Sequence, residues 1–365
     1  MKESEPIRFL VRISCMTYNH APYIVDAMNG FTMQQTDFPF VCTIIDDAST
    51  DGEQEVIRKY LEEHFDLQDS ATVRNDETDD YFLTFARHKT NTNCYFAVLF
   101  LKYNHYSIKK PKLPYLSEWN DHAKYIALCE GDDYWISSEK LQKQVECLEN
   151  HPDFTMVCNR TRLYSVKRDK YIGENYCYNQ SRIVDAKDVI NRTGLFISTC
   201  SIVYRKEISD NIPDYWRKCK VGDYPLQIMC AMRGNVYYQN EVMSVYRVEN
   251  TSSWMGQQKW SSVSKDRLEV IRSQIEMFKG FSNQFPTYRK DFDSKIADHI
   301  NRNVPSWRSQ KEDIQNFLDY FPLEIKKYPI RWKFDLWIRK LRIPKIRVWY
   351  TKVFLRDYSQ RKLIY

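Results

Sequence analysis

Short apolar runs alternate with amphipathic segments along the first part of the chain. The runs at residues 9–17 and 38–45 are rich in β-branched and aromatic residues, whereas residues 21–33 and 53–65 place their apolar positions at helical spacing. A strand, helix, strand, helix order predicts a right-handed parallel βαβ unit. The pattern therefore predicts an α/β protein.

The same reading extends over the rest of the chain. Further strands are expected at 123–129, 154–163 and 199–205, further helices at 84–102, 140–150 and 224–233, and loops at 67–80 and 103–120. From residue 265 the pattern is mostly helical. We therefore expect an α/β domain over residues 1–260 and a C-terminal helical extension over residues 261–365.

Composition places the chain among globular proteins. Its 365 residues are 43% hydrophobic, and no apolar run approaches the roughly 18–20 residues that span a bilayer. The first six residues carry no signal-peptide pattern. The ten cysteines form no CxxC pair, and several lie inside apolar runs, so we expect reduced, buried thiols and a cytoplasmic location.

Positive charge is concentrated in residues 326–365. This segment has thirteen Lys and Arg against two Asp, a charge of +11, so residues 1–325 carry −5 of the total of +6. Aromatic residues are interleaved with the cations, an arrangement that suits contact with an anionic membrane surface. A helical extension that packs on the preceding domain would have the same composition, and a role in nucleic-acid binding is not expected.

Two acidic clusters follow two of the expected strands. Asp46-Asp47 ends one run, and Glu130-Gly131-Asp132-Asp133 ends another. Ligands of open α/β sheets bind beyond the carboxyl ends of the strands, so both clusters are placed to line one crevice. Carboxylates suit Mg²⁺ or Mn²⁺, which also bind phosphate oxygens. A solvated turn would look similar, because Asp47 or Ser49 could simply cap the helix at residue 53.

These clusters and their neighbours together resemble a family 2 glycosyltransferase. The resemblance is carried by Cys15-Met16-Thr17-Tyr18-Asn19, by Gln34-Gln35-Thr36, by the segment IIDDASTDG at 44–52, and by YIALCEGDDYW at 125–135. The last segment, with Lys140-Leu141-Gln142-Lys143-Gln144, is similar to a bacterial subgroup that reads EGDDYW. The resemblance covers roughly residues 8–255 and implies a GT-A fold, which is a Rossmann-like, mostly parallel sheet flanked by helices.

The resemblance implies a nucleotide-binding half of the site. Thr17, Tyr18 and Asp47 would contact the nucleobase and ribose of a nucleotide-sugar donor, and Asp46 would order the loop. UDP is favoured as the nucleotide by the resemblance alone.

It also implies a metal and phosphate half. Asp132 would ligate the metal ion, and Asp133 would lie near the donor sugar. Glu130 stands where the family more often has Asp, so it would contact the ribose, or the metal through water. Arg87 resembles the arginine that meets donor phosphate, although it could equally lie on a solvated helix face.

A third acidic position lies in Val221-Gly222-Asp223-Tyr224-Pro225-Leu226. It resembles the place where the family keeps its catalytic acid, and Asp223 is therefore our candidate general base. An inverting transfer needs one carboxylate to accept the proton of the acceptor hydroxyl. Asp223 could also serve as a helix cap, since Pro225 falls in the first turn.

The strand at 242–248 resembles the one that closes the site. The family often continues with a His that reaches the metal or the diphosphate, but this chain has Glu249. That departure puts a third protein ligand in doubt. Arg247 could bind phosphate instead, and Trp254 could stack on donor or acceptor.

The sequence thus predicts an inverting glycosyltransferase, of the hexosyl or N-acetylhexosaminyl type. It would move a sugar from a nucleotide diphosphate donor to a saccharide or lipid-linked acceptor in the synthesis of a surface polysaccharide, at the inner face of the membrane. One alternative is a sugar-nucleotide or glycan-binding module that has lost catalysis. Another is a nucleotidyltransferase, although the Gly-rich, basic phosphate loop that such an enzyme needs near its N-terminus is missing from the sequence.

Overall fold

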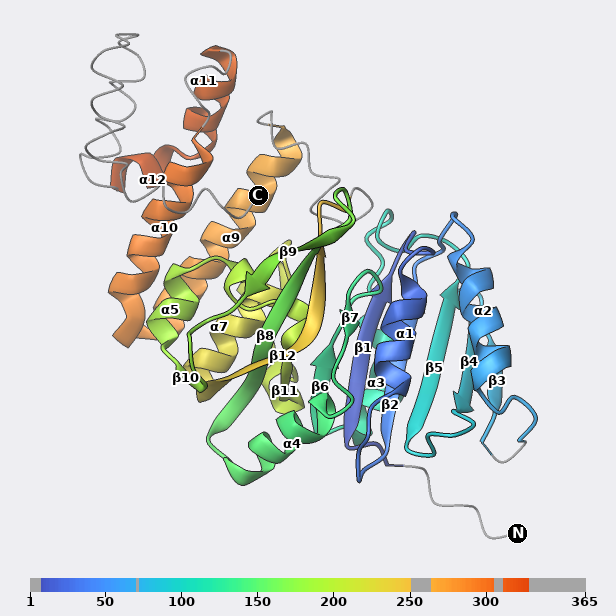
Figure 1. Cartoon of the computed structure of the whole chain (residues 1–365). Helices are drawn as coiled ribbons and strands as arrows, with labels where there is room; N and C mark the ends of the chain where they lie inside the picture. Colours follow the sequence, from blue (N-terminus) through green and yellow to red (C-terminus); the bar gives the residue numbers. More distant parts are fainter. Residues whose placement is uncertain (1–7, 70–71, 251–263, 305–310, 328–365) are drawn as a thin grey trace. The chain divides into compact units, whose positions relative to one another are not determined.

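The computed structural model describes residues 8–69, 72–250, 264–304 and 311–327. The chain divides into two compact units. The first comprises residues 1–217 and 221–258, and the second comprises residues 218–220 and 259–365. The first unit is an α/β structure and the second is helical (Figure 1).

Twelve strands in the described residues form one sheet. They are β1 (Val11–Thr17), β2 (Phe40–Asp46), β3 (Arg74–Glu77), β4 (Tyr81–Arg87), β5 (Cys94–Leu101), β6 (Tyr125–Leu128), β7 (Tyr134–Trp135), β8 (Phe154–Ser165), β9 (Lys170–Asn175), β10 (Arg182–Val184), β11 (Val203–Arg205) and β12 (Asn235–Val248). Their order is β10-β12-β8-β11-β6-β1-β2-β5-β4-β3, with β7 paired to β12 and β9 to β8.

The centre of the sheet is parallel. Strands β6, β1, β2 and β5 run in the same direction, whereas β11 beside β6 and β4 beside β5 run antiparallel to them. Because the chain passes from β1 to β2 on one side and later returns to β6 on the other, β1 lies at the point where strand order reverses. This is where open α/β sheets form their ligand crevice.

Helices cover both faces of the sheet. In the first unit they are α1 (Ile24–Thr32), α2 (Glu53–His64), α3 (Ser117–His122), α4 (Lys140–Asn150), α5 (Ala186–Asn191), α6 (Asp214–Arg217) and α7 (Asp223–Arg233), with 3-10 turns η1 (Leu113–Leu116), η2 (Gly194–Phe196), η3 (Thr199–Ser201) and η4 (Lys206–Ser209). Side chains of α1, α2 and α4 share one apolar core, and those of η1 and α3 share a second core.

Most of the predicted elements are present, but the helix expected at 84–102 is wrong. Strands β4 and β5 occupy this segment, joined by a turn at 88–93, and pair antiparallel from Tyr81–Leu101 to Arg87–Tyr95. All eight side chains of β5 are buried. A strand covered on both faces carries no alternation, so its continuous apolar run resembles a buried helix.

The second unit consists of helices. These are α9 (Lys265–Gln284), η5 (Pro286–Tyr288), α10 (Arg289–Asn303), α11 (Lys311–Tyr320) and α12 (Pro322–Lys327). Helices α9 and α10 pack through apolar side chains, with the rings of Phe281 and Phe292 stacked 5.8 Å apart. Arg272 of α9 donates to Glu324 of α12 at 2.8 Å. Most of the basic segment expected to contact a membrane, residues 328–365, lies outside the described residues, as does Trp254.

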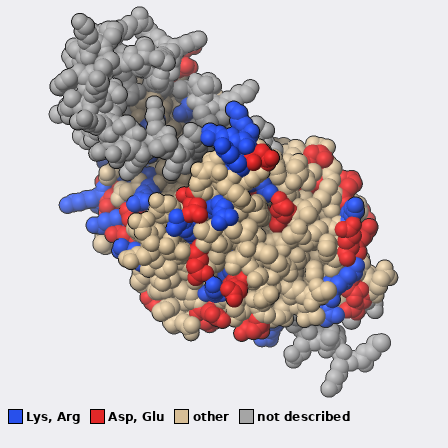
Figure 2. Space-filling model, viewed as in Figure 1, with Lys and Arg blue, Asp and Glu red and all other residues tan. Residues whose placement is uncertain are grey.

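Three further properties bear on the expectations above. None of the helices that the structure describes is long and apolar enough to cross a membrane. All ten thiols are free and eight of them are buried. On the face shown in Figure 2, acidic and basic side chains are interspersed rather than gathered by sign.

Candidate functional site

The register of the central strands brings the first two acidic clusters to one edge. Thr17, the last residue of β1, pairs with Asp46, the last residue of β2. The Asp47 amide donates to the Thr17 carbonyl at 3.0 Å, and on the other side of β1 the Gly131 amide donates to the Met16 carbonyl at 3.1 Å. The end of β1 is therefore flanked by both clusters, as the sequence predicted.

Gly131 lets the second cluster lie close to β1. A Cβ at this position would stand 2.1 Å from Thr17 Oγ1 and 3.2 Å from His20 Nδ1. Any larger residue would push the turn at 130–133 away from the strand. The glycine in this motif thus sets the depth at which the acidic turn sits.

The third acidic position, Asp223, acts on the turn at 130–133. The surrounding protein removes water from the Glu130 carboxyl and so raises its pKa, and the charges of Asp132 and Asp223 add to this effect. The resulting pKa is about 8. Glu130 nevertheless keeps its contact with solvent, as expected for a side chain at the open side of a crevice. Asp223 is therefore near enough to the acidic turn for its charge to act on Glu130.

Asp223 is held at the first turn of α7. Its Oδ1 accepts the Tyr224 amide at 2.8 Å, and its Oδ2 accepts the Thr199 hydroxyl at 3.4 Å. Burial raises the pKa of Asp223, while these hydrogen bonds oppose the increase. The side chain is half-buried, so Asp223 is a partly desolvated carboxylate with higher proton affinity than an exposed one.

Asp132 and Asp133 lie deeper than Glu130. Asp132 is 6% exposed, and its Oδ2 lies 3.8 Å from His20 Nε2. Asp133 is 1% exposed, and burial and the charge of Asp132 raise its pKa well above the ordinary value. Among the described residues, Asp133 Oδ2 has no hydrogen-bond partner. The turn therefore presents closely spaced, incompletely satisfied carboxylate oxygens.

Thr17 lies beneath this turn. Its hydroxyl donates to Glu53 of α2 and lies 3.2 Å from His20 Nδ1. Glu53 also accepts the His20 amide at 2.9 Å, and burial raises its pKa. The structure thus gives the Thr17 hydroxyl a protein partner on the floor of the crevice, while the adjacent Tyr18 is half-buried.

Asp47 is fully engaged by the loop that follows β5. Its carboxylate accepts the amides of His105 at 2.7 Å and Tyr106 at 3.1 Å, and it pairs with Lys112 Nζ at 2.6 Å. The side chain is 3% exposed. Asp46 accepts the Ser49 amide at 3.1 Å and orders the loop at its own strand end, and burial raises the pKa of its carboxyl.

Two residues lie away from the acidic turn. Arg87 pairs with Tyr95 near the start of β5, which is the end of the strands opposite to Asp46. It forms an ion pair with Asp69 at 3.5 Å. The structure therefore does not bring Arg87 to the crevice, because β4 runs antiparallel where a helix was expected. Glu249 faces Ser165 and Arg168 and not the acidic turn.

Four residues that approach the acidic positions were not singled out from the sequence. His20, Glu53, Lys112 and Asn250 all contact a predicted site residue. His20 and Glu53 lie within a few residues of the recognised motifs, and that proximity is the only sequence signal for them. Lys112 and Asn250 lie in irregular segments, where no periodic pattern indicates direction.

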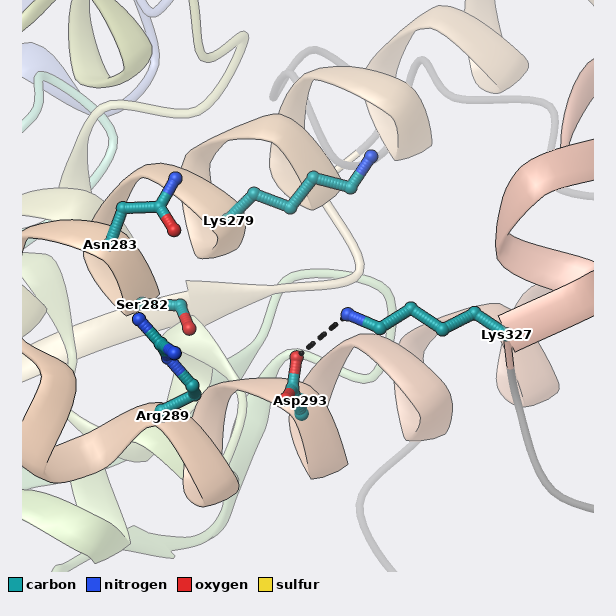
Figure 3. Close-up of a pocket in the computed structure, with 6 residues that line it drawn as sticks. All are labelled: Lys279, Ser282, Asn283, Arg289, Asp293 and Lys327. Carbon is teal, nitrogen blue, oxygen red and sulfur yellow. Dashed lines mark hydrogen bonds and ion pairs between the residues drawn. The ribbon is translucent and has the colours of Figure 1, made fainter.

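No group of three or more His, Cys, Asp or Glu side chains in the described ranges is arranged to hold a metal ion. A cavity of about 360 Å³ lies instead within the helical unit, lined by Lys279, Ser282, Asn283, Arg289, Asp293 and Lys327 (Figure 3). Lys327 forms an ion pair with Asp293 there at 3.4 Å. None of these residues belongs to the acidic motifs.

Comparison with known sequences gives relatives without an assigned function. No family model matches the chain. Uncharacterized proteins of Mycobacterium bovis and Mycobacterium tuberculosis are each 31% identical to it over 244 residues, which is 66% of this chain. The match spans 60% of the length of these relatives.

Comparison with solved structures identifies the fold. TarS from S. aureus, crystallised as residues 1–349 with UDP and with UDP-GlcNAc, has a TM-score of 0.55 and 14% sequence identity, and the match covers 88% of this chain and 82% of that 1–349 chain. A longer TarS structure has a TM-score of 0.56 at 15% identity, and the match covers 88% of this chain and 50% of that one. The predicted α/β fold of the GT-A type is thereby confirmed.

Proposed function

We propose that this chain is a glycosyltransferase that moves a sugar from a nucleotide diphosphate donor to an acceptor hydroxyl. The observation that carries the proposal is that Asp47 and the acidic turn at 130–133 flank the end of β1, at the carboxyl ends of the parallel strands. The fold of TarS, which was crystallised with UDP and UDP-GlcNAc, supports a donor of this class and makes UDP-GlcNAc the first compound to test.

Asp132 and its neighbours fit a hard cation that is shared with the donor. Mg²⁺ is usually held by one or two carboxylates together with substrate phosphates, and not by a complete protein cage. The buried, unpartnered oxygen of Asp133 and the carboxylate of Asp132 suit such an arrangement. When bound, Mn²⁺ or Mg²⁺ would neutralise charge on the departing diphosphate.

Asp223 is the proposed general base. Its raised pKa makes it a better proton acceptor than an exposed Asp, and its half-buried position at the start of α7 keeps it accessible. With a single carboxylate in this role, the acceptor oxygen attacks the anomeric carbon once and the configuration inverts. Asp47 would support the nucleoside end, through its own carboxylate or through the loop that it holds.

The acceptor is proposed to be a saccharide or a lipid-linked saccharide used in building a surface polysaccharide. The basic segment of this chain at 326–365 would then bring the enzyme to the inner face of the membrane. A binding module without turnover is the second candidate, because the Asp47 carboxylate is already occupied and Glu249 faces away from the acidic turn.

The test uses the full chain with UDP-GlcNAc, with and without Mn²⁺. We expect Mn²⁺-dependent binding of UDP by calorimetry and slow release of UDP from the donor. Asp132→Ala should abolish the Mn²⁺-dependent part of binding, whereas Asp223→Asn should leave binding intact and suppress turnover. Asp214→Asn, which changes an exposed acid at the start of α6, serves as the matched control.

The outcomes separate the candidates. Binding with no turnover for any nucleotide sugar would favour the binding module. If Asp132→Ala binds UDP and Mn²⁺ as tightly as the wild type while remaining folded, the assignment of the site is wrong.

A further inference from the structure

Residues at and just after the end of β12 form hydrogen bonds with the acidic turn at 130–133. Arg247 is 7% exposed; its guanidinium donates to the Asp132 carbonyl at 2.7 Å, and its amide donates to Asp133 Oδ1 at 2.8 Å. Three residues later, Asn250 donates its side-chain amide to Asp132 Oδ2 at 3.1 Å. The end of β12 and the residues just after it therefore fix the backbone of this turn and the carboxylates of Asp132 and Asp133.

The guanidinium is itself held on its remaining sides. It forms an ion pair with Asp26 of α1, and it lies 4.9 Å from the ring of Tyr23 and 4.5 Å from the ring of Tyr134. A planar guanidinium with such partners has one orientation only. The Arg247 guanidinium thus joins α1, β7 and the acidic turn, and these contacts occupy the group that would otherwise bind a ligand phosphate.

We propose that Arg247 and Asn250 are positioning residues that aim the Asp132 carboxylate at the donor diphosphate and its cation. The inference rests on the proposed function of this crevice. Glu249 stands where the resembling family has a His, but its carboxylate accepts from Ser165 and Arg168. Asn250, and not Glu249, therefore contacts the acidic turn together with Arg247.

The physical reason is the weak restraint on a carboxylate that emerges from a short turn. The other close group at Asp132 is His20, whose Nε2 lies at 3.8 Å, beyond hydrogen-bond distance. Without Arg247 the Asp132 carbonyl would lose its charged donor. Without Asn250 the Oδ2 atom of Asp132 would lose the hydrogen bond from the Asn250 side-chain amide. Loss of residues that orient metal ligands typically lowers metal affinity or activity about 10- to 100-fold.

The experiment measures the Mn²⁺ concentration that gives half-maximal binding of UDP to the full chain. We expect Asn250→Ala and Arg247→Met each to raise this concentration at least about tenfold, and Arg247→Lys to give an intermediate value because a lysine can still donate to the carbonyl. Lys143→Met is the matched control, since Lys143 pairs with Glu241 of the same strand far along it from Arg247. Thermal unfolding of each variant monitors the fold.

A merely structural role predicts a different result. In that case Arg247→Met would lower the melting temperature while the Mn²⁺ requirement, measured well below that temperature, stayed at the wild-type value, and Asn250→Ala would have no effect. Either result overturns the inference if Asp132→Ala abolishes Mn²⁺-dependent binding in the same assay. If Asp132→Ala also binds normally, the proposed function of the crevice has failed, and the inference fails with it.

Discussion

Lys140 gives a quantitative test of the packing beneath the site. Lys140 is 0% exposed, and its ammonium group donates to Gln144 Oε1 at 2.7 Å and lies 4.2 Å from the centroid of the Trp135 ring. Burial lowers the pKa of Lys140 to about 7, from an ordinary value of 10.5. Between these two values the unfolded chain carries a proton that the folded protein has released.

The stability of the fold should therefore rise with pH in this window. Each pH unit between the two pKa values contributes about 1.4 kcal/mol, so the wild type should gain about 2.7 kcal/mol from pH 7.5 to pH 9.5 through this group. Lys140→Met removes the titrating group and keeps a flexible side chain of similar length. It also leaves the Gln144 oxygen without its donor, a loss of about 1–3 kcal/mol that does not depend on pH.

The assay is urea unfolding of both proteins at several pH values. Subtracting one free energy of unfolding from the other cancels every titration common to both and leaves that of Lys140. We expect the difference, wild type minus Lys140→Met, to increase steadily above pH 7. A difference that is constant from pH 7 to pH 9.5 would show that Lys140 keeps its proton in the folded protein and would refute the reasoning.

Three further predictions concern the crevice. Asp47→Ala should weaken the binding of UDP and of UDP-GlcNAc by similar factors in calorimetry, because it removes the anchor of the loop at 104–112. A loss of affinity for UDP-GlcNAc alone would place Asp47 near the transferred sugar. Asp223→Asn should reduce turnover about 10²- to 10⁴-fold with little change in donor affinity, and NMR of the wild-type product should show an inverted anomeric configuration. Near-normal turnover of the variant, or a retained configuration in the product, would remove Asp223 as the base. Gly131→Ala should weaken Mn²⁺-dependent UDP binding, since its Cβ would strike Thr17 Oγ1; unchanged affinity would mean that the turn can shift freely.

The sequence was informative where chemistry and periodicity agreed. Helices α1, α2, α4 and α7 lie within two or three residues of their predicted bounds, because each has an amphipathic pattern and a defined stop. The first two acidic clusters could be grouped because they follow parallel strands, whose carboxyl ends lie on the same side of the sheet.

Other features depended on tertiary contacts that a linear pattern does not record. Residues 84–102 form β4 and β5, since a fully buried strand and a buried helix have similar composition. Arg87 was misplaced for that reason. Whether Asp47 faces a ligand or a loop depends on Lys112 and on two backbone amides more than fifty residues away, and no local signal indicates their approach.

The way in which the loop after β5 is anchored has an evolutionary consequence. Asp47 binds the backbone amides of His105 and Tyr106, which every residue except proline supplies. The side chain of His105 is buried and bonded to Tyr115, but that of Tyr106 is exposed and can therefore be exchanged without loosening that part of the anchor, provided that Asp47 and Lys112 remain. A lineage could in this way alter the exposed surface of this loop by substituting Tyr106, while inheriting the scaffold that supports it unchanged.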